Sequence, residues 1–255
     1  MKFRVAVCQF DVEWCQCHSN LALAESYVVR AEADMVVLPE MFATGFATEP
    51  QAVAQSMQGE IVEWMRSTAA RYDCAIVGTA IIEEGGRYFN RALLAKPSGE
   101  VAYADKRHLF SIGGEAEHLS AGSQRVVVEY GGLRWLMLTC YDLRFPVWSR
   151  NCSDYDVALY PAAWPSSRRN AWQTLLRARA IENVAYVVGA NRAGSDPTVC
   201  YSGDSAIIDF RGDTLVEIGC DDGVIVAELD QNELEHFREK FPVFRDSDKF
   251  QLELR

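Results

Sequence analysis

Short apolar runs rich in β-branched residues recur along the chain and alternate with longer stretches of helical periodicity. Leu21, Ala24 and Val28 fall on one face of a predicted helix, which Ser19 or Asn20 is placed to cap. The pattern predicts helices at residues 19–33, 59–72, 168–183 and 231–240. It predicts strands at residues 3–10, 35–38, 74–82, 92–95, 100–104, 125–130, 133–139, 157–160, 185–190, 205–210 and 224–229.

This alternation of strands and helices indicates an α/β fold built in layers. Glycine pairs at 85–86 and 131–132 supply turns between strands, and a polar loop covers residues 111–122. Because no linker, repeat or low-complexity tract divides the chain, we expect a single domain over residues 1–255. The tail 241–255 mixes apolar and charged residues, so docking on a partner subunit and covering the chain's own core both remain open.

Composition and charge narrow the classes of partner. The 255 residues are 49% hydrophobic, which is enough for a sizeable core. The formal net charge of −11 disfavours nucleic acid and anionic membranes as partners. No uncharged apolar run approaches the length of a membrane span, and no signal peptide is evident, so we expect a cytoplasmic protein whose eight cysteines are reduced.

Three polar residues stand directly after predicted buried strands. Glu40 follows the strand at 35–38, Lys106 follows the strand at 100–104, and Cys140 follows the strand at 133–139. Open α/β sheets bind ligands beyond the carboxyl ends of their strands, so we expect these side chains to converge on one pocket. Taken singly, each residue has an ordinary interpretation as a packed thiol, a helix cap or a surface charge.

The chemistries of the three residues complement one another. A thiol becomes nucleophilic when a base takes its proton, and Glu40 is the expected base. An ammonium group such as that of Lys106 favours the thiolate and stabilises the negative oxygen formed when a carbonyl or nitrile carbon is attacked. The sequence therefore predicts nucleophilic catalysis by Cys140.

The segments around these residues carry a family resemblance. Residues 38–42 (LPEMF), 105–110 (DKRHLF) and 139–146 (TCYDLRFP) match, in order and spacing, the Glu, Lys, Cys triad of the nitrilase superfamily of carbon–nitrogen hydrolases. The chain resembles this family from the AVCQ segment at 6–9 to the YSGDS segment at 201–205. The residues around Cys140 and Lys106 are most similar to the omega-amidase branch, whose bacterial members act on alpha-ketoglutaramate.

The resemblance implies a fold, a reaction and further site residues. It implies a four-layer α-β-β-α sandwich, a homodimer or higher homo-oligomer, and hydrolysis of a small amide to a carboxylate and ammonia without metal or other cofactor. The family's second glutamate maps onto Glu115, with Glu117 as the competing candidate. The backbone N–H of Tyr141 is expected to help Lys106 hold the oxyanion, and a thioester is the expected intermediate.

Weaker signals concern the pocket. Phe42, Tyr141 and Trp164 are candidates for its lining, although aromatic residues near strand ends are more often core. Arg168 or Arg169 is a conceivable ligand for a substrate carboxylate. We expect Asp142 and Arg144 to form an ion pair that fixes the turn after the nucleophile, in preference to contacting substrate.

Other functions fit less well. N-carbamoyl amino acid amidase and nitrilase are alternatives within the family. A papain-like protease needs a Cys/His pair, and no papain-type signature surrounds any cysteine; the chain has four histidines, His18, His108, His118 and His236. A zinc site at Cys15, Cys17 and His18 lacks a second ligand pair. A non-enzymatic thiol sensor is the alternative from another class, and it would not need Glu40.

Overall fold

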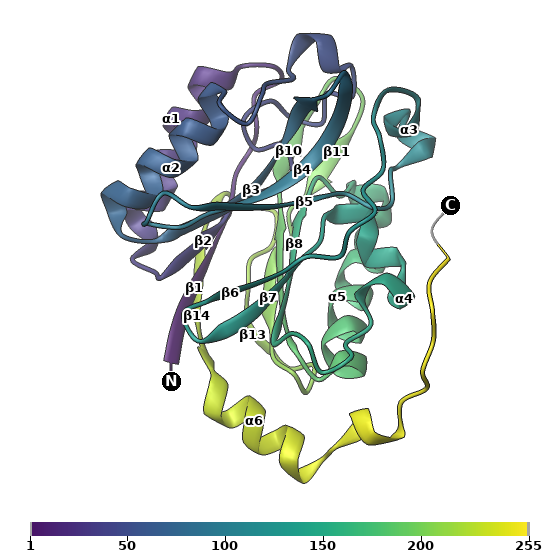
Figure 1. The fold of residues 1–255 in the computed structure, drawn as a ribbon. Coiled ribbons are helices and arrows are strands. Elements are labelled where there is room, and N and C mark those ends of the chain that lie inside the picture. Colours follow the sequence, from purple (N-terminus) through teal and green to yellow (C-terminus); the bar gives the residue numbers. More distant parts are fainter. Residues whose placement is uncertain (1, 254–255) are drawn as a thin grey trace.

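Two six-stranded mixed sheets lie face to face at the centre of the computed structural model, which describes residues 2–253 (Figure 1). In spatial order the first sheet holds β14 (Gly223–Asp230), β1 (Lys2–Gln9), β2 (Met35–Val37), β3 (Ala75–Glu84), β4 (Arg87–Ala95) and β5 (Val101–Asp105). The second holds β13 (Thr214–Glu217), β12 (Ala206–Ile208), β9 (Tyr186–Asn191), β8 (Val157–Ala162), β7 (Leu133–Met137) and β6 (Val127–Tyr130). A separate ribbon pairs β10 (Ala193–Ser195) with β11 (Cys200–Ser202).

Helices cover the outer face of each sheet (Figure 1). α1 (Cys17–Ala31) and α2 (Glu60–Tyr72) pack on the first sheet, and α5 (Arg169–Asn183) packs on the second. The remaining helices are α3 (Glu115–His118), α4 (Pro146–Ser149), α6 (Gln231–Lys240) and 3₁₀ turns at Pro50–Ala52, Ser111–Gly113, Cys140–Arg144, Ser166–Arg168 and Val243–Asp246. The expected four-layer α-β-β-α sandwich is confirmed.

The central strands are continuous apolar runs in the sequence because both of their faces are buried. One face packs in the core between the sheets, and the other packs in a core between a sheet and its helices. In β1, Val5 and Val7 face the core between the sheets, whereas Ala6 and Cys8 face the helices. β8 shows the same alternation: Val157 faces the core between the sheets, and Ala158 faces α5. Burial on both faces is typical of the parallel strands at the centre of a layered α/β fold.

Strand direction brings the ends of several strands to one edge. β1, β2 and β3 run parallel, and β5 has the same direction because it is antiparallel to β4, which is antiparallel to β3. In the second sheet, β7, β8 and β9 run parallel. The residues that follow β2 and β5 therefore lie at one end of the first sheet, where the loops after β7 and β8 also arrive.

The structure corrects some expected element boundaries. α1 begins at Cys17, and Asn20 is not its cap, because the buried Asn20 amide binds the main chain of Glu13 and Ala43. β4 starts five residues before the expected strand at 92–95. The loop at 111–122 contains α3, and the β10–β11 ribbon was not predicted.

The start of the C-terminal tail covers the chain's own core. Phe237 of α6 packs with Val243 and Phe244 against the cluster between the sheets. Further along the tail, Phe250 and Leu252 are exposed.

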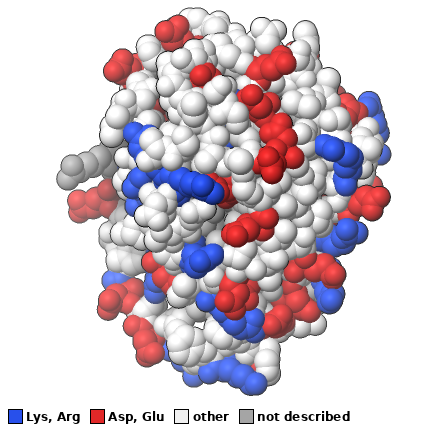
Figure 2. All heavy atoms as spheres, turned by 180° about the vertical axis from the view of Figure 1, so that it is seen from behind, with Lys and Arg blue, Asp and Glu red and all other residues white. Residues whose placement is uncertain are grey.

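On the face of the molecule drawn in Figure 2, Lys and Arg side chains are interspersed with Asp and Glu. Within residues 2–253, no helix has the length and apolar character that a membrane crossing requires.

Candidate active site

Four predicted site residues converge in one buried cluster. Glu40 follows β2, Lys106 follows β5, Glu115 opens α3, and Cys140 opens the 3₁₀ turn after β7. Their exposed fractions are 0%, 2%, 0% and 7%. The Glu40 carboxylate and the Lys106 ammonium group thus come from the first sheet and the thiol comes from the second, so the cluster lies where the two sheets meet. Glu117 is exposed, and Glu115 is the glutamate that joins the cluster.

Lys106 bridges the two carboxylates. Its Nζ lies 2.8 Å from Oε1 of Glu40 and 2.8 Å from Oε2 of Glu115, and both ion pairs are shielded from solvent. Oε2 of Glu115 also accepts the backbone N–H of Phe110 at 2.6 Å. A buried ammonium group needs such partners, since an unpaired charge would be strongly destabilising there.

Asn90 and Ala163 are two members of the cluster that the sequence did not reveal. The Asn90 Nδ2 group donates to Oε1 of Glu40 at 2.7 Å and to Oε1 of Glu115 at 2.8 Å. The backbone N–H of Ala163, just after β8, donates to Oε2 of Glu40 at 2.9 Å. Glu40 is thereby held from both sheets.

The turn that carries Cys140 has an unusual backbone. Cys140 has φ of 42°, a left-handed conformation that side chains other than glycine rarely adopt and that occurs at functional turns. The turn is capped by Asp142, whose Oδ2 accepts the N–H of Thr139 at 3.0 Å. Through Oδ1, Asp142 also accepts the N–H of His108 at 2.9 Å.

The expected ion pair between Asp142 and Arg144 is wrong. Asp142 is occupied by Thr139 and His108, and the Arg144 guanidinium instead lies over the Trp164 ring, 5.1 Å from its centroid. The physical reason is that Asp142 folds back to cap its own turn and binds a segment 34 residues away, so the neighbouring arginine is left to face the cavity.

Charge and burial set the protonation of the thiol and the amine. Burial, reinforced by the negative charge of Glu40, raises the pKa of the Cys140 thiol well above its usual range, although Lys106 and the Ala163 N–H lower it. Burial also acts against the Lys106 ammonium, but the charges of Glu115 and Glu40 outweigh it and raise the pKa of Lys106. Lys106 favours the thiolate as expected, but burial and Glu40 outweigh it.

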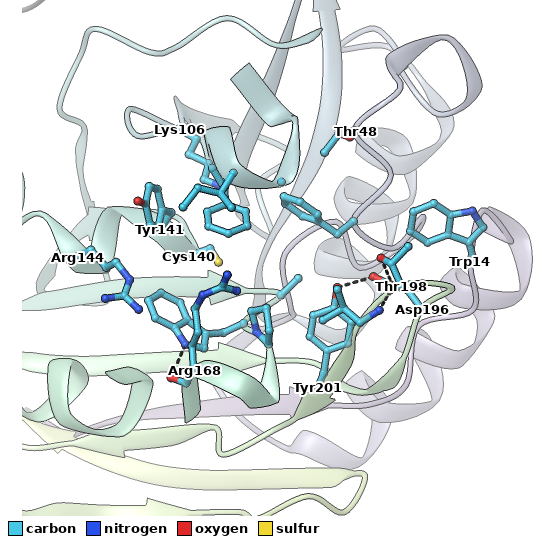
Figure 3. Close-up of a pocket in the computed structure, with 18 residues that line it drawn as sticks. Trp14, Thr48, Lys106, Cys140, Tyr141, Arg144, Arg168, Asp196, Thr198 and Tyr201 are labelled. Carbon is cyan, nitrogen blue, oxygen red and sulfur yellow. Dashed lines mark hydrogen bonds between the residues drawn. The ribbon is translucent and has the colours of Figure 1, made fainter. Parts of the chain in front are cut away.

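A cavity of about 420 Å³ opens onto Cys140 and Lys106 (Figure 3). Of the aromatic residues predicted to line it, Tyr141 and Trp164 do. Phe42 does not: it is buried between the first sheet and its helices, beside Trp64. The volume suits a small molecule.

Two guanidinium groups stand at this cavity. Arg144 and Arg168 both line it, and Figure 3 shows their side chains on the same side of the cavity as the Cys140 sulfur. Arg168 lies over the Phe110 ring at 5.1 Å from its centroid. Arg169, the other candidate for a substrate carboxylate, is not among the lining residues and pairs with Asp204 at 2.6 Å.

The opposite wall is built on the β10–β11 ribbon. Tyr201 of β11 lines the cavity and donates its hydroxyl to Asp196 at 2.5 Å. Asp196 also accepts two bonds from Thr198, which leaves its carboxylate well satisfied within the protein.

The His18 imidazole, considered above as a metal ligand, pairs with Glu60 at 2.6 Å.

Comparisons with known proteins agree with this geometry. The sequence profile of the carbon–nitrogen hydrolase family matches residues 4–239. The omega-amidase YafV of Escherichia coli (strain K12) is 49% identical over 222 residues, which cover 86% of this chain and 86% of that protein. A 2-oxoglutaramate amidase of Bacillus subtilis (strain 168) is 35% identical over 260 residues, covering 96% of this chain and 98% of that protein.

A solved structure shows the same fold. XC1258 from Xanthomonas campestris, described as a CN-hydrolase superfamily protein with an arsenic adduct in the active site, superposes with a TM-score of 0.95 at 39% sequence identity. The match covers 99% of this chain and 100% of that one.

Proposed function

Because the chain belongs to the carbon–nitrogen hydrolase family and is a hydrolase acting on carbon–nitrogen bonds, we propose that it hydrolyses the terminal amide of a small omega-amido acid through Cys140. The observation that carries the proposal is the buried Lys106 ammonium, 2.8 Å from both Glu40 and Glu115, at the floor of the cavity that exposes Cys140. Acid, base, nucleophile and a positive charge for the developing oxyanion are then within one site.

The first half of the reaction acylates the enzyme. Glu40 takes the thiol proton as Cys140 Sγ attacks the amide carbon, which suits a thiol whose pKa is raised by burial. Lys106 and the backbone N–H of Tyr141 stabilise the oxyanion of the tetrahedral intermediate. When the carbon–nitrogen bond breaks, Glu40 returns the proton to the departing ammonia and a thioester remains.

The second half releases the acid. Glu40 removes a proton from water, which attacks the thioester carbon through a second oxyanion held by the same donors. Collapse of that intermediate breaks the carbon–sulfur bond, and Glu40 gives the proton back to Cys140. Glu115 touches Lys106 through both of its oxygens, so its contribution is to hold the ammonium group in place.

The substrate class follows from the cavity and from the relatives. Relatives are named omega-amidase and 2-oxoglutaramate amidase, so their substrates carry an amide at one end and an acid at the other. Arg144 and Arg168 supply the positive charge that such an acid group needs, on the side of the cavity that holds Cys140.

The buried thiol argues against a redox sensor. Sensor cysteines are accessible and have a lowered pKa, whereas burial and Glu40 raise the pKa of Cys140. A Cys/His protease is also disfavoured, because the nearby His108 is engaged by Asp142 and the acid–base group beside the thiol is Glu40. The cytoplasmic location and the homodimer stay predictions.

The decisive experiment is an ammonia-release screen. It compares alpha-ketoglutaramate, succinamate, glutaramate, a carbamoyl amino acid and a simple nitrile. We expect the omega-amido acids to be turned over, and we expect Cys140→Ala to abolish release while the circular dichroism spectrum is kept. Preference for the nitrile or the carbamoyl compound would overturn the substrate class, and turnover by Cys140→Ala would overturn the nucleophile.

A further inference from the structure

Asn90 is a buried amide that lies between the two carboxylates of the cluster. It sits in β4, and its backbone oxygen accepts the N–H of Lys106 at 2.9 Å, so Asn90 and Lys106 are neighbours across two strands. Both side chains reach the same two oxygens, Oε1 of Glu40 and Oε1 of Glu115. Asn90 is fully buried, and within residues 2–253 its Oδ1 has no hydrogen-bond partner.

An amide at this point has a clear electrostatic effect. Two ionised carboxylates and one ammonium group leave a net charge of −1 in a site shielded from water. The two Nδ2 hydrogens of Asn90 supply one donor to each carboxylate without adding a charge. Hydrogen bonds to a carboxylate are stronger than those between neutral groups, so the Asn90 amide holds both carboxylates firmly in place.

The two oxygens of Glu40 are therefore unequal. Oε1 accepts from both Asn90 and Lys106, whereas Oε2 accepts the backbone N–H of Ala163. The same Ala163 N–H also lowers the pKa of the Cys140 thiol, which places the thiol beside this side of the carboxylate. Oε2 is thus the oxygen with room for the thiol proton.

We propose that Asn90 is a positioning residue that fixes Oε1 of Glu40, so that Oε2 takes the proton of Cys140. The inference rests on the proposed function, in which Glu40 is the base. It also explains why the Asn90 oxygen is unsatisfied: the amide is oriented by its two carboxylate acceptors rather than by a donor of its own.

Four titratable groups act on Glu40. They are Lys106 at the end of β5, Glu115 on α3, Cys140 on the turn after β7 and Tyr201 on β11. The pKa values of Lys106, Cys140 and Tyr201 are all raised, Tyr201 chiefly by burial and by its bond to Asp196. These three groups therefore do not titrate on the acid side of neutrality.

The test is the pH profile of kcat/KM for ammonia release in two variants of Asn90. Asn90→Asp puts a third carboxylate against the other two, and Asn90→Ser leaves at most one donor. Asn90→Asp adds a negative charge beside the carboxylates and Asn90→Ser removes a donor from them, so we expect the acid limb of the profile to move to higher pH, further in Asn90→Asp than in Asn90→Ser. At neutral pH we expect at least about a tenfold loss in kcat for Asn90→Asp.

A matched control separates positioning from packing. Asn183 is an equally buried asparagine of α5, bonded to Asn151 and Arg179 outside the cavity. Asn183→Asp should lower the melting temperature without moving the acid limb. An Asn90→Asp or Asn90→Ser enzyme that stays folded and keeps the wild-type limb would overturn the proposal.

Alkylation of Cys140 provides a readout that does not depend on turnover. The rate of labelling by iodoacetamide, followed by mass spectrometry of the peptide that contains Cys140, should depend on pH with the same displaced acid limb in the Asn90 variants. Glu40→Gln is the reference. If Glu40→Gln labels and turns over as the wild type does, the proposed function fails; if Glu40→Gln is inactive and the Asn90 profiles are unchanged, the role of Asn90 alone fails.

Discussion

Nδ1 of His108 lies 2.8 Å from Oδ1 of Asp142, and this contact joins the segment that follows Lys106 to the turn that carries Cys140. The imidazole ring also stacks on Phe145, with centroids 3.7 Å apart and planes within 4° of parallel. The ammonium group and the thiol come from different sheets. His108 and Asp142 each lie two residues after one of them, so their contact ties the two segments to each other.

His108 should therefore matter for position rather than for proton transfer. In His108→Asn the side-chain amide can still donate to Asp142, and we expect kcat for ammonia release to fall by less than about tenfold. Loss of a general base would cost about 10²–10⁴ in rate. Steady-state assays distinguish the two, and a loss in that larger range with an intact fold would favour a Cys/His mechanism.

Lys106→Met removes the charge that faces the oxyanion. We expect kcat to fall by about 10²–10³ or more, because loss of one oxyanion donor has an effect of that size. The substitution also leaves two carboxylates 2.8 Å from the lost charge without their counter-ion, so thermal denaturation is measured alongside. A fall below about tenfold in a folded variant would contradict the role of Lys106.

The two arginines at the cavity should determine preference for an acidic substrate. A charged hydrogen bond contributes about 1.5–3 kcal/mol, so Arg168→Met or Arg144→Met should reduce kcat/KM for alpha-ketoglutaramate by about 10–150-fold. A neutral amide of similar length should be little affected. Arg169→Met is the matched control, since Arg169 pairs with Asp204 instead of lining the cavity. Equal losses for acidic and neutral amides would argue against this subsite.

Asp156 should make stability depend on pH at the acid end. Burial acts against its charge, but hydrogen bonds and charge from Arg134 and Arg238 outweigh burial and lower the pKa of Asp156 below its usual 3.8. A lowered pKa stabilises the fold above the unfolded value, and that contribution disappears as pH falls through the folded value. Urea denaturation from about pH 5 down to about pH 3 should show a smaller decline in Asp156→Asn. Parallel declines in both proteins would exclude this contribution.

The layered fold and the three residues at the strand ends, Glu40, Lys106 and Cys140, could be predicted because they follow from the local pattern of apolar and polar residues. A strand buried on both faces is a short apolar run, and the residue after it lies at the sheet edge. The structure brings Glu40, Lys106 and Cys140 together at that edge. These inferences need only the direction of each strand and the polarity of its neighbours.

Asn90 and Ala163 could not be found in that way. Asn90 lies between Phe89 and Arg91 near the start of β4, where no apolar alternation marks a strand, and only the pairing register sets it beside Lys106. Ala163 acts through its main-chain N–H, so its residue type carries no signal. The wrong pairing of Asp142 has the same origin, because its partner His108 is distant in sequence.

The division of the site between two sheets has a consequence for biosynthesis. While the ribosome is still making the second half of the chain, the carboxylate and ammonium groups exist without a sulfur to activate, and the later half alone has a sulfur without an activator. Hydrolytic competence can therefore emerge only after both sheets have formed. The first sheet is complete only when β14, from near the end of the chain, pairs with β1, so recovery of activity in a refolding sample reports assembly of the whole chain rather than of its first half.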